Sequence, residues 1–306
     1  MCLPDPAPSC HPEEGGPYNR AVSTPLSVHL QHWLPQRALT ELAGRIARAQ
    51  GGSLTQALIR RFVRRYGVNM EEAANPDIAA YASFNDFFTR ALRADARPLS
   101  DAGFLCPVDG AISQFGPIAG DQIFQAKGHL YSTRALVGGD AELASRFDNG
   151  SFATIYLSPK DYHRIHMPTA GRLRRMVHVP GDLYSVNPAT ARGVPGLFAR
   201  NERVVCVFDV PHRDRTVPFV LVLVGATIVG SMATTWHGVV NPPRPGSVRD
   251  WRYDDQDIRF ERGQEMGRFL LGSTVVMLWP HGVIDFNPHW APAGAVRMGE
   301  AMGEAL

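Results

Sequence analysis

The sequence predicts an α+β fold in which a helical N-terminal portion packs on a β-rich, mainly antiparallel body. Before Pro98, apolar residues recur at the three- and four-residue spacing of helices. Between about residues 103 and 300, short apolar runs alternate with Gly and Pro, as in strands joined by tight connections. The chain has 306 residues, 44% of them hydrophobic, so it can bury a large core.

This change of pattern divides the chain into three regions. Residues 1–23 carry prolines and acids without apolar periodicity, and we expect a disordered extension that is neither a signal peptide nor a mitochondrial presequence. Residues 24–98 are the helical region, and residues 99–306 are the β-rich domain.

Two helices are expected early in the helical region. Gly51 and Gly52 separate them, and Ser53 is a candidate N-cap for the second. The apolar positions that mark them are Leu39, Leu42 and Ile46 in the first helix and Leu54, Leu58 and Phe62 in the second.

The same two helices are strongly basic. Between Arg37 and Arg65 there are seven arginines and one acid, Glu41. One interpretation is a solvated face on helices that pack against the core. The other is a membrane-associating surface that lies on anionic lipid, where each basic residue contributes about 1 kcal/mol.

Short capped helices and several strands follow. Ser83 and Asp140 each precede a helix-like segment and are candidate N-caps. The clearest strands are residues 152–157, 204–208, 219–224 and 275–278.

Residues 217–236 include no charged side chain and are numerous enough to span a bilayer. Pro218, Gly225 and Gly230 interrupt the run, and its Val and Ile content favours strands. We therefore expect two buried strands joined at residues 225–226 rather than a transmembrane helix.

Composition excludes several kinds of chemistry. The net charge of +2 gives no sign of a nucleic-acid partner. Only Lys127 and Lys160 among the 31 basic residues are lysines, so a lysine-based imine would have to use one of them. The four cysteines have no Cys-x-x-Cys spacing, so we expect reduced thiols in a cytoplasmic setting rather than a zinc ribbon or a redox pair.

Two histidines stand out, His163 and His166, in a segment bounded by prolines that we expect to be a loop or a single turn after the strand ending near Leu157. A metal site would need a further ligand that is not evident nearby, so no metal is expected. One of the two could be a structural histidine. We favour two histidines with distinct catalytic roles.

Asp109 and Ser273 complete a set of polar residues that could activate a nucleophile. Asp109 precedes Gly110, which is also a common hairpin signal, so Asp109 is either a turn residue or the partner of a histidine. Ser273 follows Gly272 and is either a strand serine or a nucleophile, since glycine offers little hindrance to attack on its carbonyl.

These motifs in this order resemble the phosphatidylserine decarboxylase family, in its bacterial, pyruvoyl-dependent, membrane-associated form. The resemblance runs from about Leu26 to Gly299. Further segments that carry it are residues 125–129, 179–187, 198–203, 224–231 and 262–269.

The resemblance implies an inactive precursor that cuts itself between Gly272 and Ser273. Ser273 would attack the carbonyl of Gly272, with His166, held by Asp109, as the base. Opening of the resulting ester and loss of ammonia would leave a pyruvoyl group on residue 273. The products would be a β chain, 1–272, and an α chain, 273–306, forming a heterodimer that could pair again as a homodimer.

The resemblance also implies an activity, the decarboxylation of phosphatidylserine to phosphatidylethanolamine in phospholipid biosynthesis. The pyruvoyl group from Ser273 would be the cofactor, and His163 would be the proton donor or decarboxylation residue. The enzyme would lie peripherally on the cytoplasmic side of the cell membrane, on an anionic surface. Phe and Leu side chains near Leu183 and Phe198 are candidates for the lining of the site.

Two alternatives remain at this point. A serine hydrolase would use Asp109, His166 and Ser273 on an external ester or amide without cutting its own chain. A non-catalytic membrane-binding protein would keep the scaffold and bind lipid without processing.

Overall fold

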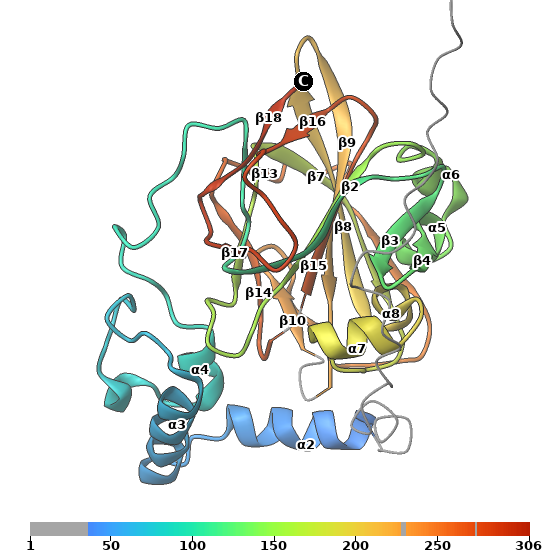
Figure 1. Cartoon of the computed structure of the whole chain (residues 1–306). Helices are drawn as coiled ribbons and strands as arrows, with labels where there is room; N and C mark the ends of the chain where they lie inside the picture. The colour runs from blue at the N-terminus through green and yellow to red at the C-terminus, as the bar shows by residue number, and fades with distance from the viewer. Residues whose placement is uncertain (1–35, 228–230, 273) are drawn as a thin grey trace, which may run out of the picture.

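The computed structural model describes residues 36–227, 231–272 and 274–306, and it confirms the α+β fold (Figure 1). The predicted disordered extension, 1–23, and the start of the predicted helical region lie outside these residues.

The helices lie mostly in the first two thirds of the described chain, and strands continue to its end. The helices are α2 Gln36–Arg48, α3 Ser53–Tyr66, a 3-10 helix Ile78–Ala80, α4 Phe84–Phe88, α5 Thr133–Leu136, α6 Ala141–Ser145, α7 Pro188–Gly193 and α8 Leu197–Arg200. The strands are β1 Phe104–Leu105, β2 Gly110–Pro117, β3 Gln122–Ala126, β4 His129–Ser132, β5 Ser151–Tyr156, β6 Arg164–His166, β7 Gly171–Val179, β8 Arg203–His212, β9 Arg215–Val224, β10 Met232–Thr234, β11 Gly238–Asn241, β12 Arg249–Arg252, β13 Arg259–Phe260, β14 Glu265–Phe269, β15 Thr274–Trp279, β16 Ile284–Phe286, β17 Ala295–Val296 and β18 Ala301–Ala305.

The central feature is a sheet that has nine strands among the described residues. Its order is β12–β7–β8–β9–β15–β5–β2–β17, with β13 pairing beside β12 on β7. Its paired strands run antiparallel, as predicted. β15 lies near the middle, between β9 and β5.

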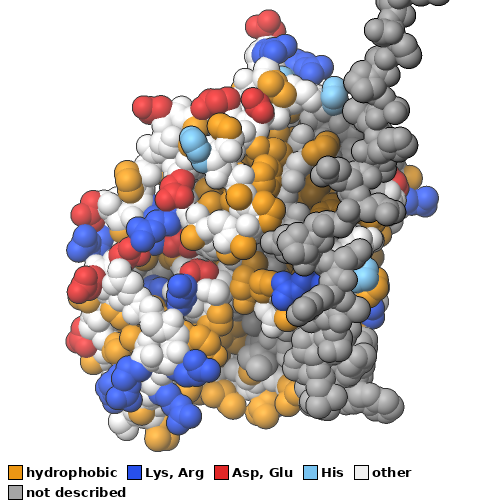
Figure 2. Space-filling model, viewed as in Figure 1, with side chains coloured by type: hydrophobic (Ala, Val, Ile, Leu, Met, Phe, Trp, Pro, Cys, Tyr) orange, Lys and Arg blue, Asp and Glu red, His pale blue; other side chains and the backbone are white. Residues whose placement is uncertain are grey.

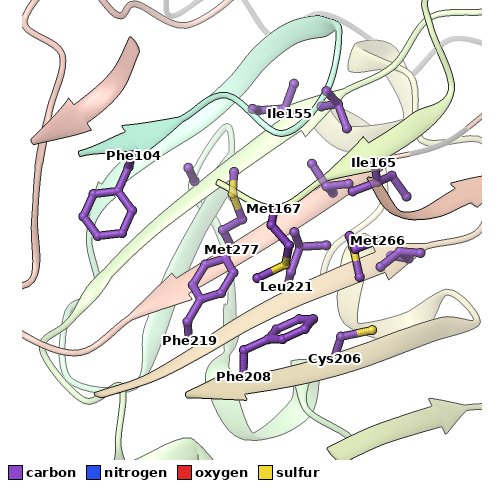
Figure 3. Close-up of a cluster of buried hydrophobic side chains, with 14 of the residues drawn as sticks. Phe104, Ile155, Ile165, Met167, Cys206, Phe208, Phe219, Leu221, Met266 and Met277 are labelled. Carbon is purple, nitrogen blue, oxygen red and sulfur yellow. The ribbon is translucent and has the colours of Figure 1, made fainter. Parts of the chain in front are cut away.

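Both faces of this sheet are buried. Successive side chains of a strand point to opposite faces, so a strand buried along its length contributes to a core on each side. In β15, Val275, Met277 and Trp279 enter one hydrophobic core, whereas Val276 and Leu278 enter the other. Figure 3 shows part of the first core, where Phe208, Phe219 and Met277 gather. Burial on both sides explains why these strands read as continuous apolar runs rather than alternating ones.

Different layers cover the two faces. The first core is closed by the smaller sheets β1–β18–β16 and β11–β10–β14–β6, and the second by the β3–β4 hairpin with α5 to α8 (Figure 1). The prediction of two strands in residues 217–236 is confirmed: β9 belongs to the large sheet, and β10 to one of the smaller sheets. None of the described helices combines the length and the hydrophobicity that a membrane span requires.

The predicted helix caps have mixed outcomes. Ser83 accepts a hydrogen bond from the Asp86 N–H, and Asp140 accepts one from the Leu143 N–H, so both caps are confirmed. The prediction for Ser53 is wrong, because Gly52 occupies the N-cap position and α3 already begins at Ser53. Gly52 has φ 54°, a conformation that glycine adopts without steric cost and that turns the chain into the helix.

A third core holds the N-terminal helices together and against the body. Phe84, Phe87 and Phe88 of α4 pack with Ile59 of α3, and Leu271 packs against the same cluster. The helical region is therefore in direct contact with the segment that precedes the predicted cleavage site.

Of the apolar side chains that marked α2 and α3 in the sequence, Phe62 packs against the third core, and the five aliphatic ones remain exposed. Leu54 keeps 78% of its surface and Leu42 keeps 56%. The others are Leu39, Ile46 and Leu58. Figure 2 shows hydrophobic side chains along this end of the molecule, next to a group of basic side chains over α3.

Candidate active site

The predicted scissile bond follows a segment that passes from one sheet to another. β14 ends at Phe269 and β15 begins at Thr274. β14 pairs with β6, and the Phe269 N–H donates to the carbonyl of His163 at 3.0 Å. The strand pairing therefore brings the histidine segment alongside residues 269–272. Ser273 itself lies outside the described residues.

His163 lies against Gly272. Its Nδ1 is 2.8 Å from the Asp161 carbonyl oxygen, which can only accept, so Nδ1 carries the proton and Nε2 carries the lone pair. Nε2 is buried and has no hydrogen-bond partner among the described residues. A Cβ built on Gly272 would lie 3.0 Å from this nitrogen. The free lone pair of His163 therefore faces the glycine of the predicted scissile bond.

The surroundings keep His163 neutral. The Phe88 ring packs on the imidazole with 4.1 Å between ring centroids, and the histidine is fully buried. Burial lowers the pKa of His163 to about 3, since a charged imidazolium would lose its hydration. In the uncleaved chain His163 is thus a hydrogen-bond acceptor and a potential base.

His166 belongs to the short strand β6, whereas the sequence analysis expected a loop or turn. Its Nδ1 donates to the Gly263 carbonyl at 2.7 Å, and its Nε2 is 3.1 Å from the Tyr162 hydroxyl. Burial raises the pKa of Tyr162 to about 12, so the hydroxyl stays protonated. It therefore donates a hydrogen bond to Nε2 of His166. Burial also lowers the pKa of His166, which is therefore neutral with both nitrogens engaged.

Asp109 is held by an arginine. The Arg97 Nε lies 3.0 Å from Oδ1 of Asp109, Arg97 Nη2 lies 2.5 Å from Oδ2, and the Met298 N–H donates to Oδ1 at 2.9 Å. Arg97 Nη2 also donates to Glu72 at 2.7 Å. The carboxylate is thus almost fully satisfied within a buried charged network.

The position after Asp109 requires a glycine, Gly110. β2 begins at Gly110, so Asp109 precedes a strand and does not form the hairpin turn that was one interpretation of the sequence. A Cβ at position 110 would collide with the carbonyl oxygen of Tyr156 on β5. The glycine lets β2 lie close to β5, which fixes the backbone that carries Asp109.

The structure brings only some of the predicted residues together. His163 meets Gly272, but no hydrogen bond joins Asp109 to His166 among the described atoms. Arg97 bonds both oxygens of the Asp109 carboxylate, and Gly263 and Tyr162 bond the two nitrogens of His166. The charge of Asp109 still raises the pKa of His166 slightly, against the larger effect of burial.

Sequence reasoning did not find Arg97 or Phe88. Arg97 follows two other arginines, Arg90 and Arg93, and Phe88 is one of several phenylalanines, so neither stood out in the sequence. Within the described part of the chain, no three His, Cys, Asp or Glu side chains gather as a metal site would require.

A mainly apolar cavity of about 410 Å³ adjoins Gly272. Phe62 and Tyr66 of α3 form one wall, and residues 185–187 form part of another. The lining side chains expected near Leu183 and Phe198 stay a prediction. Leu183 and Phe198 are both 1% exposed and do not line this cavity.

Comparisons with known proteins agree with the motifs. A family model described as phosphatidylserine decarboxylase matches residues 84–304, and a second, described as PSD, matches residues 26–67. The chain is 68% identical over 282 residues to the phosphatidylserine decarboxylase proenzyme of Dechloromonas aromatica, covering 92% of this chain and 99% of the relative. It is 69% identical over 284 residues to that of Methylibium petroleiphilum, covering 93% and 99%.

Proposed function

This chain belongs to the phosphatidylserine decarboxylase family, and we propose that Ser273 of its precursor attacks the carbonyl of Gly272 and becomes its pyruvoyl group. The chain is a proenzyme, and its activity is the decarboxylation of phosphatidylserine to phosphatidylethanolamine. The serine hydrolase alternative is disfavoured, because relatives with about two thirds of their residues identical are decarboxylase proenzymes.

One observation carries the assignment of the site. A buried imidazole nitrogen without a partner is costly, and His163 presents to Gly272 a nitrogen that has no partner among the described residues. The buried hydroxyl of Thr274, the residue after Ser273, also has no partner among the described residues. These unsatisfied atoms support a site that forms its final polar contacts with a group made from residue 273.

For the cleavage step we propose Asp109 and His166 as the supporting pair. The neutral imidazole of His166 can take a proton once Tyr162 releases its Nε2. Asp109 would then stabilise the positive charge that forms on the ring, as its electrostatic effect on His166 already favours.

For turnover we propose that His163 handles the proton at the reacting carbon. A pyruvoyl ketone on residue 273 supplies the electron sink that the loss of carbon dioxide from an amino acid needs. His163 is neutral in the uncleaved chain, and an anionic substrate beside it would raise its pKa toward the range in which it can donate a proton. The apolar cavity beside Gly272 would keep water from the reacting groups.

The two products of cleavage would remain together. β15 belongs to the proposed α chain, yet it pairs with β5 and β9 of the proposed β chain and is buried along its whole length. A central strand with both neighbours in place loses little when one peptide bond before it is cut. The homodimer of these pairs stays a prediction from the resemblance.

The exposed end of the molecule supports a peripheral location on an anionic membrane surface, and the cytoplasmic side stays a prediction from the resemblance. α3 presents exposed Leu54 and Leu58 together with the basic side chains of Arg60, Arg61, Arg64 and Arg65. Apolar side chains that enter the interface and cations that attract the headgroups are the two components of such binding.

Substitution of the proposed nucleophile tests the function directly. We expect Ser273→Ala to remain one uncut chain without decarboxylase activity, and we expect the control Ser145→Ala, on α6, to be processed normally. Gel electrophoresis and a phosphatidylserine turnover assay report the two properties. Cleavage of the Ser273→Ala chain at the same position would reject the assignment.

A further inference from the structure

A second cavity adjoins the segment before the predicted scissile bond. It has a volume of about 320 Å³ and lies between α2, the chain after β11, and Leu270 and Leu271. Leu271 borders both this cavity and the apolar one beside Gly272. The two cavities are therefore neighbours at the reaction centre, and they differ in character.

The second cavity is basic. Arg45, Arg48 and Arg244 line it, against a single acid, Glu41. Arg45 and Arg48 are three residues apart in the last turn of α2, so they lie on the same side of the helix. Neither has an ion pair among the described residues. A guanidinium nitrogen of Arg48 lies 3.3 Å from where a Cβ on Gly44 would be, so the missing side chain leaves room for it.

Arg244 lies in the chain after β11, and its side chain reaches inward to the buried Glu202. Its Nε donates to Glu202 at 2.8 Å, and Glu202 also bonds His178 Nε2 at 2.8 Å. Burial alone would raise the pKa of Glu202, but the bond from His178 and the charge of Arg244 lower it, so Glu202 is a carboxylate. Glu202 thus anchors Arg244 in the wall, while Arg45 and Arg48 supply the net positive charge.

Building on the proposed function, we propose that this arginine cavity, defined by Arg45, Arg48 and Arg244, binds the phosphodiester of the substrate headgroup. Guanidinium groups bind phosphate oxygens through paired, charge-assisted hydrogen bonds. In phosphatidylserine only four covalent bonds separate the amine nitrogen from the phosphorus. An amine that reacts at residue 273 therefore requires an anion site close by, and the arginine cavity begins two residues before that position.

Binding to an uncleaved chain tests this without any turnover. The full-length Ser273→Ala protein has no pyruvoyl group, and glycerophosphoserine carries the headgroup without acyl chains, so membrane binding does not contribute. We expect Arg48→Gln and Arg244→Gln each to weaken its binding by at least about tenfold in calorimetry. Glu41→Gln should strengthen it, because the one acid of the cavity is removed.

The matched control is Arg213→Gln, an exposed arginine on the β8–β9 turn, at the far end of the molecule from α2 (Figure 1). It removes the same charge and should leave binding unchanged. Free serine, which has no phosphate, should show no difference among the variants. Inorganic phosphate should compete with glycerophosphoserine.

Equal affinity of the Arg48→Gln, Arg244→Gln and Arg213→Gln proteins for glycerophosphoserine would overturn the proposal. So would phosphate that binds at the arginines without displacing the headgroup probe, since the cavity would then be an anion site unrelated to the substrate. If Arg244→Gln fails to fold because Glu202 loses its partner, Arg48→Gln on the surface decides alone. A failure of self-cleavage at Ser273 would leave these binding results unaffected.

Discussion

His163 and His166 are three positions apart in the sequence, yet their ring nitrogens have different surroundings. Among the described residues, Nε2 of His163 has no hydrogen-bond partner and lies beside Gly272, whereas Gly263 and Tyr162 bond the two nitrogens of His166. His166 is the last residue of strand β6, whereas His163 precedes that strand, so their side chains meet different neighbours.

Because of this difference, we expect substitutions of the two histidines to affect different steps. We expect His163→Ala to reduce decarboxylation strongly while cleavage still proceeds, and His166→Ala to slow cleavage itself. The measurement is the fraction of cut chain over time, followed by the turnover of the cut protein. If His163→Ala blocks cleavage and His166→Ala does not, the roles are reversed, and the position of His163 against Gly272 would then mark it as the base.

Arg97 is the residue that the structure adds to the predicted set. Its side chain is 6% exposed and joins Asp109 to Glu72. Removal of one partner from a buried ion pair leaves an uncompensated charge, which typically costs about 3–5 kcal/mol. We expect Arg97→Met to destabilise the Ser273→Ala chain by about that amount, and Arg97→Lys to recover part of it.

The control is Arg93→Met, which removes a surface pair with Asp95 and should cost below about 1 kcal/mol. Urea unfolding of the three variants gives the free energies. An Arg97→Met protein that is no less stable than Arg93→Met would show that the network around Asp109 contributes little to the fold.

At the scale of elements, the exposure of α3 bears on two interpretations that the sequence left open, a solvated helix face and a membrane-associating surface. Leu54 and Leu58 are exposed, so they do not serve the core of the described structure. We expect neutralisation of Arg60, Arg61, Arg64 and Arg65 to weaken binding to anionic vesicles by about 1 kcal/mol for each charge. Vesicle sedimentation at low and high salt measures the loss, which should shrink as salt screens the charges.

A pairwise control makes this comparison specific. Arg60→Gln/Arg61→Gln should weaken binding, whereas Arg213→Gln/Arg215→Gln, on the β8–β9 turn, should not. Equal sedimentation of these two double variants would show that the basic face of α3 is a solvated surface without a role in membrane binding.

Strands were predictable from the sequence, but their partners were not. β5, β8, β9 and β15 appear as apolar runs because both faces of the large sheet are buried. Sheet membership depends on pairings between distant segments, such as Thr274 with Tyr156 and Val224, and no local pattern records these. The placement of β10 in a different sheet from β9 is an example.

The candidate site shows the same division. Asp109, His163 and Gly272 could be proposed from sequence motifs, because their residue types suit a self-cleavage and decarboxylation site. The bond from Arg97 to Asp109 and the packing of Phe88 on His163 join elements far apart in the sequence, so only the fold could reveal them. The α3 cap was missed for a local reason, since Gly52 takes the cap position through its backbone conformation.

At the scale of the whole molecule, the helical region, the large sheet and the smaller sheets meet around residues 269–272. Leu271 packs on the core of the N-terminal helices, and β14 and β15 on either side of it belong to different sheets. The proposed scissile bond is thus held by three parts of the fold at once. The buried pairing of β15 is expected to keep the two products in one complex after cleavage.

Intact mass spectrometry of the purified protein, under native and denaturing conditions, tests the central claim most directly. The account predicts one complex under native conditions that separates on denaturation into a chain ending at Gly272 and a chain beginning at residue 273. The second chain should be lighter by one ammonia than the same peptide with an N-terminal serine. A single 33.6 kDa chain in a preparation with full phosphatidylserine turnover would contradict it.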